Sequence, residues 1–84
     1  MSSVNRQNAT IMSIDEIGQL IKTRRKLFRL TQLDLAEMTG VSHNTIRKIE
    51  RGKANPTIEV LSKLGTVLGY QIDLNIPHTP NQPA

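Results

Sequence analysis

Few side chains in this sequence could perform catalysis or bind a metal ion. The chain has 84 residues, no cysteine and two histidines, His43 and His78. The absence of cysteine excludes disulfides, thiolate metal sites and a cysteine nucleophile. The two histidines do not provide the ligand spacing that zinc requires, and no glycine-rich phosphate loop is present. We therefore expect no metal, no cofactor and no enzymatic activity.

Basic side chains are the other chemically distinctive group, and they concentrate in the middle of the chain. The net charge is +4, and the segment from Lys22 to Lys53 holds nine basic and three acidic residues. A basic centre on a small protein indicates a polyanionic partner such as nucleic acid. A solvated lysine-rich surface is the alternative. With one Tyr, one Phe and no Trp, the chain lacks the stacking platforms of a single-strand binder.

The rest of the composition favours one compact helical domain with flexible ends. Hydrophobic residues make up 37% of the chain and are almost all aliphatic, which suits a helical bundle. No apolar stretch could span a membrane, and the N-terminus lacks the apolar core of a signal peptide, so we expect a cytoplasmic protein. Residues 1–12 are predicted to form a flexible arm and residues 77–84 a disordered tail.

Cap residues and apolar periodicity predict four short helices that must position these side chains. Ser13 and Glu16, three residues apart, fit a capping box at the start of the first helix. The fourth helix is expected to turn Ile58, Leu61, Leu64, Val67 and Leu68 inward. The other expected helix starts are at Thr31, Ser42 and Pro56–Thr57, and the expected ends are at Gly40, Gly52 and Gly69.

A different pattern follows the fourth helix. Residues 70–76 alternate apolar and polar side chains, which predicts a half-buried strand that ends at Pro77. A lone strand has no partner within the chain, so the same strand of a second copy is the simplest partner. This predicts a homodimer that merges the apolar faces of Tyr70, Ile72, Leu74 and Ile76. A frayed coil or an extension of the helix is the alternative.

Residues 32–51 (QLDLAEMTGVSHNTIRKIER) fit two helices that pack steeply across a tight turn. Ala36 must be small because the next helix crosses over it, and Gly40 must adopt the backbone angles of the turn. Ile46 fills the wedge between the helices. The remaining hinge packing is expected from Leu35, Val41 and Ile49. Each residue alone is common, but together at this spacing they predict a helix-turn-helix.

The stretch LTQLDLAEMTGVSHNTIRKIERGKANPTIEVLSKL resembles the Xre/Cro-type helix-turn-helix proteins, which include the lambdoid phage repressors. The resemblance extends over residues 30–68 without an insertion. It implies an all-α fold, a lambda-repressor-like bundle of four to five short helices over residues 13–69. Here a dimerisation strand over residues 70–76 is expected to follow. The resemblance also implies binding to double-stranded operator DNA and transcriptional repression.

The resemblance implies DNA contacts for the third helix, the recognition helix, and for its surroundings. Its base-reading positions correspond to His43, Asn44 and Lys48, with Thr45 and Arg47 flanking them. Asn can pair with adenine and Lys can donate to guanine, while the base preference of His is open. A solvated helix face is the alternative. The implied phosphate contacts, which position the protein without reading sequence, come from Thr31, Gln32, Arg51, Lys53 and the backbone near Asn55.

Arg25 and Glu50 match positions that form a partly buried ion pair in the phage repressors. The resemblance implies that the pair joins the first and third helices here and holds the recognition helix in place. Removing one partner of a deeply buried pair costs about 3–5 kcal/mol, because the other charge is stranded.

The four-helix core that ends in LGYQIDLNIP further resembles the HipB-type antitoxins, whose strands pair between subunits. That resemblance implies an autorepressor that also binds a HipA-type kinase toxin, although the short tail offers no clear anchor for one. Two alternatives remain: a free-standing regulator, and an interaction module that has lost DNA binding. Asn44, Lys48 and the basic residues argue against the second. A dimer predicts a two-fold symmetric operator with recognition helices about 34 Å apart.

Overall fold

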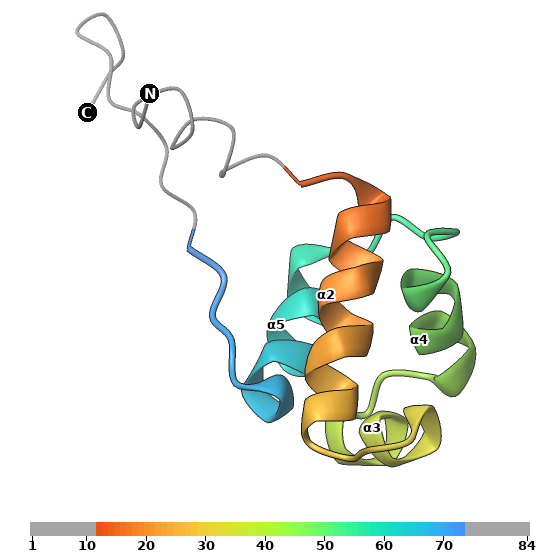
Figure 1. The fold of residues 1–84 in the computed structure, drawn as a ribbon, viewed down its shortest axis with the longest axis vertical. Helices are drawn as coiled ribbons and strands as arrows, with labels where there is room; N and C mark the ends of the chain where they lie inside the picture. The colour runs from red at the N-terminus through yellow and green to blue at the C-terminus, as the bar shows by residue number, and fades with distance from the viewer. Residues whose placement is uncertain (1–11, 74–84) are drawn as a thin grey trace, which may run out of the picture.

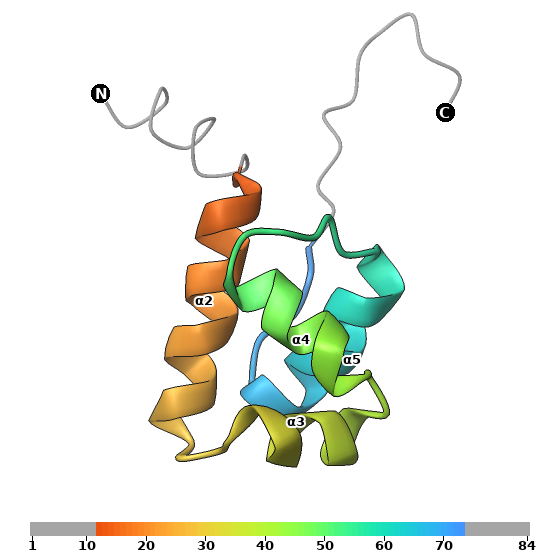
Figure 2. The ribbon, with the colours of Figure 1, turned by 90° about the vertical axis from the view of Figure 1, so that its right-hand side faces the viewer.

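Four helices make up the part of the chain that the structure, a computed structural model, describes, which is residues 12–73 (Figure 1). Their bounds are α2 Ile14–Leu27, α3 Gln32–Thr39, α4 His43–Glu50 and α5 Ile58–Leu68. Helices α2 and α5 lie side by side, and α4 lies on the other side of α2 (Figure 1). Helix α3 crosses the end of the bundle where α2 finishes (Figure 2).

Side chains at the predicted N-caps start the helices. The hydroxyl of Ser13 accepts the Glu16 N–H at 3.1 Å, and the Glu16 carboxylate accepts the Ser13 N–H at 2.8 Å. Thr31 and Asp34 form the same reciprocal pair at the start of α3. These bonds satisfy amide groups that have no partner within the helix. The N-caps of α4 and α5 are Ser42 and Thr57, as expected.

Glycine ends two of the helices by adopting the left-handed conformation. Gly40 follows α3 with φ of 78°, and Gly69 follows α5 with φ of 77°. A side chain at such a φ strains the backbone, so glycine is favoured there. At the end of α2 the turn is made by Arg29 instead, with φ of 58°.

The core lies where all four helices meet. Its buried aliphatic side chains are Ile21, Leu35, Val41, Ile46, Ile49, Leu64 and Leu68. Helices α2 and α4 approach closely at Gly18, where an added Cβ would collide with the backbone carbonyl oxygen of Ile49. The wedge residue Ile46 and the hinge residue Ile49 are fully buried, and Ala36 packs partly buried against the core. The helix-turn-helix packing expected from the sequence is therefore present.

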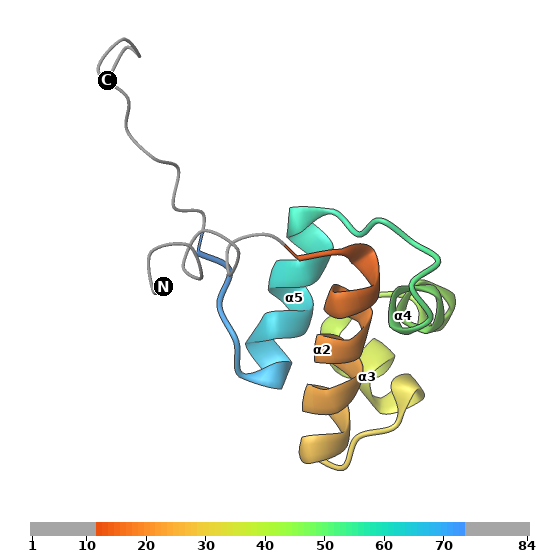
Figure 3. The same cartoon turned by 45° about the horizontal axis from the view of Figure 1, so that its top comes forward.

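Some apolar side chains do not face the core. Ile58 is 53% exposed, so its predicted inward orientation is wrong. Thr57 caps α5 directly before it, and the first turn of α5 extends beyond the neighbouring helices (Figure 3). On α3, Leu33 and Met38 are also exposed, because this short helix contacts the bundle along one side. Leu35 is the residue of α3 that becomes fully buried.

The expected strand over residues 70–76 is not present in its described part. Residues 70–73 form no strand, and Leu74 and Ile76 lie outside the described residues, as do residues 1–11 of the expected arm and the expected tail. A strand needs a neighbouring backbone, and no segment among residues 12–73 pairs with residues 70–73. Tyr70 instead packs against its own core, and its hydroxyl donates to the Leu61 carbonyl at 2.6 Å. Residues 70–73 run alongside α5 (Figures 1 and 3).

Candidate nucleic-acid interface

Helix α4 has one buried face and one polar, exposed face. Ile46, Ile49 and Glu50 are its buried residues. At 100° per residue the exposed positions fall within an arc of about 140°, so they share one side of the helix. The exposed residues of this face are His43, Asn44, Arg47, Lys48 and the C-capping Arg51. Five side chains able to donate hydrogen bonds thus point away from the bundle.

In the first turn of α4, Thr45 takes part in the N-cap, whereas His43 and Asn44 are exposed. The hydroxyl of Ser42 donates to Thr45 Oγ1 at 2.7 Å, and the Thr45 N–H donates back to Ser42 at 3.1 Å. Thr45 is half-buried and its hydroxyl oxygen accepts a hydrogen bond in the cap, whereas the other expected base-reading residues are exposed. His43 and Asn44 are exposed beside it. A groove of DNA could reach those two side chains without disturbing the cap.

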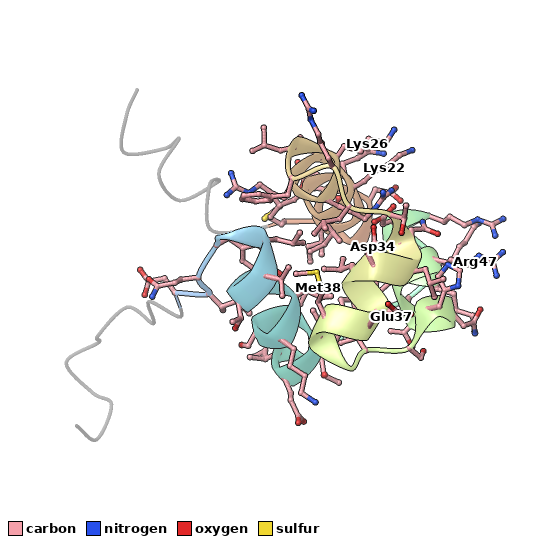
Figure 4. The ribbon with its side chains drawn as sticks, turned by 90° about the horizontal axis from the view of Figure 1, so that it is seen from below. Lys22, Lys26, Asp34, Glu37, Met38 and Arg47 are labelled. Atoms are coloured by element: carbon pink, nitrogen blue, oxygen red, sulfur yellow. The ribbon has the colours of Figure 1, made fainter. Side chains whose placement is uncertain are left out.

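Positive charge gathers at the C-terminal end of α4. Arg47 and Lys48 lie in its last turn, and Lys53 is exposed in the loop that follows. Cations at this end of a helix also interact favourably with the helix dipole. Arg47 projects away from the bundle (Figure 4). Asn55 is exposed further along the same loop.

Arg25 and Glu50 join α2 to α4 through a buried, bidentate ion pair. Arg25 Nε donates to Glu50 Oε2 at 2.7 Å, and Nη2 donates to Oε1 at 2.9 Å. Arg25 Nη1 also donates to the Leu30 carbonyl at 2.8 Å, in the connection to α3. The side chains are only 10% and 3% exposed. One guanidinium thereby links three elements of the helix-turn-helix.

Gln32 completes this buried network from the first turn of α3. Its amide donates to Glu50 Oε1 at 3.0 Å, so it supports α4 directly. The Thr31 hydroxyl is occupied by the capping box. In that box the backbone N–H of Thr31 donates to Asp34 and lowers the pKa of its carboxyl. Thr31 and Gln32 are the N-cap and the first residue of α3. The N-terminus of a helix attracts phosphate groups.

The network also keeps Glu50 ionised. Burial by itself raises the pKa of its carboxyl, but hydrogen bonds from Arg25 and Gln32, with the charges of Arg25 and Lys22, outweigh burial and lower the pKa below 4.5. The hydrogen bond to Glu50 correspondingly raises the pKa of Arg25. A carboxylate at the C-terminal end of a helix opposes the helix dipole, so it needs such cationic partners.

Arg24 has a structural role that sequence analysis missed. Its Nε donates to the Leu68 carbonyl at 2.9 Å, and its Nη2 donates to the Gly69 carbonyl at 3.2 Å. The guanidinium also lies 5.6 Å from the centre of the Phe28 ring, within cation–π range. Arg24 thus ties α2 to the free carbonyls at the end of α5. The four-residue spacing of Arg24 and Phe28 was the available sequence signal.

Within residues 12–73, no cluster of three or more His, Asp or Glu side chains could hold a metal ion. No helix in the same part of the chain is both long and apolar enough to cross a membrane. The exposed face of α4 offers hydrogen-bond donors and positive charge, which match the base edges and phosphates of DNA.

A family model for the helix-turn-helix proteins, HTH_3, matches residues 21–75. The chain belongs to this family. It is 39% identical over 56 residues to the immunity repressor protein of Bacillus phage phi105, and 42% identical over 53 residues to an uncharacterized HTH-type transcriptional regulator of Methanocaldococcus jannaschii. These matches cover 67% and 63% of this chain, and 39% and 80% of the two relatives.

A solved structure supports the same assignment. An HTH_3 family transcriptional regulator from Vibrio cholerae superposes with a TM-score of 0.65 at 35% identity, over 71% of this chain and 34% of that one. The chain thus spans well under half of the phage repressor and of the Vibrio regulator. Family and fold place it among the helix-turn-helix proteins, and the relatives matched in Methanocaldococcus jannaschii and Vibrio cholerae are described as transcriptional regulators.

Proposed function

We propose that the chain is a transcriptional repressor that reads an operator with the exposed face of α4. The observation that carries this proposal is the position of Asn44 and Lys48 on the exposed side of a helix whose opposite side is locked into the core. Rigid presentation favours specific readout, since a well-placed contact to the correct base discriminates by about 1–3 kcal/mol. The similarity to a phage immunity repressor supports repression as the outcome.

In this proposal the base contacts are chosen by exposure, and the phosphate contacts are those that the family resemblance implies. His43, Asn44 and Lys48 read bases, with Arg47 beside them, while Thr45 acts mainly through the cap. Phosphate contacts come from the start of α3 and from the end of α4 with its loop. Those residues are Thr31, Gln32, Arg51, Lys53 and the backbone near Asn55.

A selection from randomised duplex DNA, followed by fluorescence anisotropy, tests the proposal. The full chain should enrich a two-fold symmetric site and bind it far more tightly than a scrambled duplex. Asn44→Ala should relax the base preference at one position in each half-site. Lys63→Ala, on α5, is the control and should change neither preference nor affinity. Equal binding to every duplex would refute sequence-specific repression.

The repressor acts as a homodimer through residues 70–76 in this proposal. Ile72 is half-buried and lines a pocket between α5 and the segment after it, with Gly65, Thr66 and Gly69 on the helix side. Because Tyr70 packs on its own chain, the partner contacts fall to Ile72, Leu74 and Ile76, with Tyr70 holding the segment in place. Two dyad-related copies would account for a symmetric operator.

Sedimentation velocity on matched variants tests the dimer. Ile72→Glu places a charge on the proposed contact face and should shift the chain to monomer. Gln19→Glu adds the same charge at an exposed position of α2 that does not line this pocket, and it should leave the dimer intact. A wild-type monomer at all concentrations would refute the dimer, as would equal behaviour of the two variants.

A second candidate function is that of an antitoxin. The chain is 38% identical over 45 residues, 54% of its length, to antitoxin PezA of Streptococcus pneumoniae, which it matches over 28% of that protein. On this proposal the repressor also binds a toxin encoded beside it, for which a HipA-type kinase is the form suggested by the HipB resemblance. Co-expression with the adjacent gene product should yield a stable complex. Failure to co-purify would leave a free-standing regulator.

A further inference from the structure

Two lysines on α2 lie outside the helix-turn-helix but beside its basic surface. Lys22 and Lys26 are one helical turn apart, so their side chains share one side of α2. Both point to the side of the molecule on which Arg47 projects, and away from α5 (Figure 4). Lys26 is exposed and Lys22 half-buried. The basic surface of α4 therefore continues onto a second helix.

Neighbouring carboxylates do not form ion pairs with these two lysines in the described part of the chain. Lys63 on α5, by contrast, pairs with Glu59 at 3.7 Å. Lys22 lies close enough to Glu50 for its charge to act on that carboxyl. Glu50, however, is already engaged by Arg25 and Gln32. Glu50 therefore balances little of the positive charge that Lys22, Lys26 and the exposed bases of α4 place on this surface, and a polyanion can balance the remainder.

We propose that Lys22 and Lys26 bind backbone phosphates next to the groove that α4 enters. This inference rests on the proposed DNA-binding function and extends its contact surface from the helix-turn-helix to α2. The lysines act as point charges on a flexible stem, so they hold the protein on the duplex without distinguishing bases. Their contribution is therefore the same for operator and scrambled DNA.

Counterion release gives the size of the expected effect. Each phosphate neutralised on duplex DNA contributes about 0.9 to the slope of log K against log salt. Loss of both lysines should reduce that slope by about 1.8 for each bound chain, which is about 3.6 for the proposed dimer, and should weaken binding about 30-fold per chain at 0.15 M salt if counterion release supplies the whole gain. Each single loss should account for about half of the slope change.

Anisotropy titrations from low to high salt on operator and scrambled duplexes test the proposal. Lys22→Gln, Lys26→Gln and the double variant are compared with Lys63→Gln, which removes the same single charge from α5. Lys22→Arg and Lys26→Arg should retain the wild-type slope. Circular dichroism melts check that each variant folds.

The expected result is a shallower slope for the α2 variants on both duplexes, with an unchanged ratio of operator to scrambled affinity. Slopes equal to that of Lys63→Gln would overturn the proposal while leaving the repressor function intact. A change confined to operator DNA would also overturn it, because it would indicate base reading. Absence of any DNA binding by the wild type would overturn both proposals together.

Discussion

Replacing Glu50 by Gln tests the buried network that holds the recognition helix. The substitution keeps the size of the side chain but removes its negative charge. Arg25 then retains a guanidinium that is only 10% exposed and has lost its ionised partner. Breaking a buried pair in this way costs about 3–5 kcal/mol. Because Arg25 keeps its bond to the Leu30 carbonyl and a small contact with water, we expect about 3 kcal/mol.

A loss of this size is easy to measure in so small a domain. At about 4–8 °C per kcal/mol, the melting temperature should fall by about 12–24 °C. The chain has no Trp, so far-UV circular dichroism is the suitable probe for thermal and urea unfolding. All samples need the same protein concentration, because the stability of a dimer depends on it.

Glu59→Gln is a matched control within the same chain. It removes a carboxylate from an exposed pair with Lys63, whose side chains are 79% and 51% exposed. Exposed pairs of this kind contribute about 0.2–1 kcal/mol or less. If Glu50→Gln and Glu59→Gln lower stability equally, the reasoning about the buried network is refuted. A double-mutant cycle with Arg25→Gln would then measure the coupling directly.

Three further predictions concern pH and close packing. The lowered pKa of Glu50 contributes stability above pH 4.5 that is lost as pH falls through the folded pKa. Urea unfolding measured at a series of acidic pH values should therefore show a smaller loss of stability with falling pH for Glu50→Gln than for wild type. Burial raises the pKa of Tyr70 from 10.0 to about 12, so stability should fall as pH rises between these values, and Tyr70→Phe should lose that component of the alkaline titration. Gly18→Ala forces α2 away from the Ile49 carbonyl and should cost more than about 1 kcal/mol in thermal melts. Thr23→Ala, exposed on the same helix, should cost less than about 0.5 kcal/mol, and equal losses would contradict the close approach.

Sequence patterns were reliable where the determining interaction is local. Ser13, Thr31, Ser42 and Thr57 begin helices through bonds to residues three positions away. Gly40 is the expected end of α3, because the backbone angle needed there favours glycine whatever surrounds it. The spacing of small and apolar residues over 32–51 likewise indicated the helix-turn-helix.

The orientation of side chains was less predictable, because it depends on which elements pack against each helix. Ile58 fits the apolar pattern of α5 but lies beyond the helices that cover its neighbours. The hydrogen bond that the Thr45 hydroxyl accepts from Ser42 in the cap was likewise not expected from the sequence. The expected strand needed a partner backbone, which no described segment of the chain supplies to residues 70–73, and Tyr70 packs on its own core instead.

The sequence by itself determined the helix starts, the ends of α3 and α5 at glycine, the turn and the family, since these depend on neighbouring residues or on the joint spacing of a motif. Tertiary structure decided that Gly18 is the contact point of α2 and α4, and that Arg24 ties α2 to the end of α5. Arg25 and Glu50 are 25 residues apart, and only a resemblance linked them in advance. Contacts over such separations arise when helices cross, which local propensity does not encode.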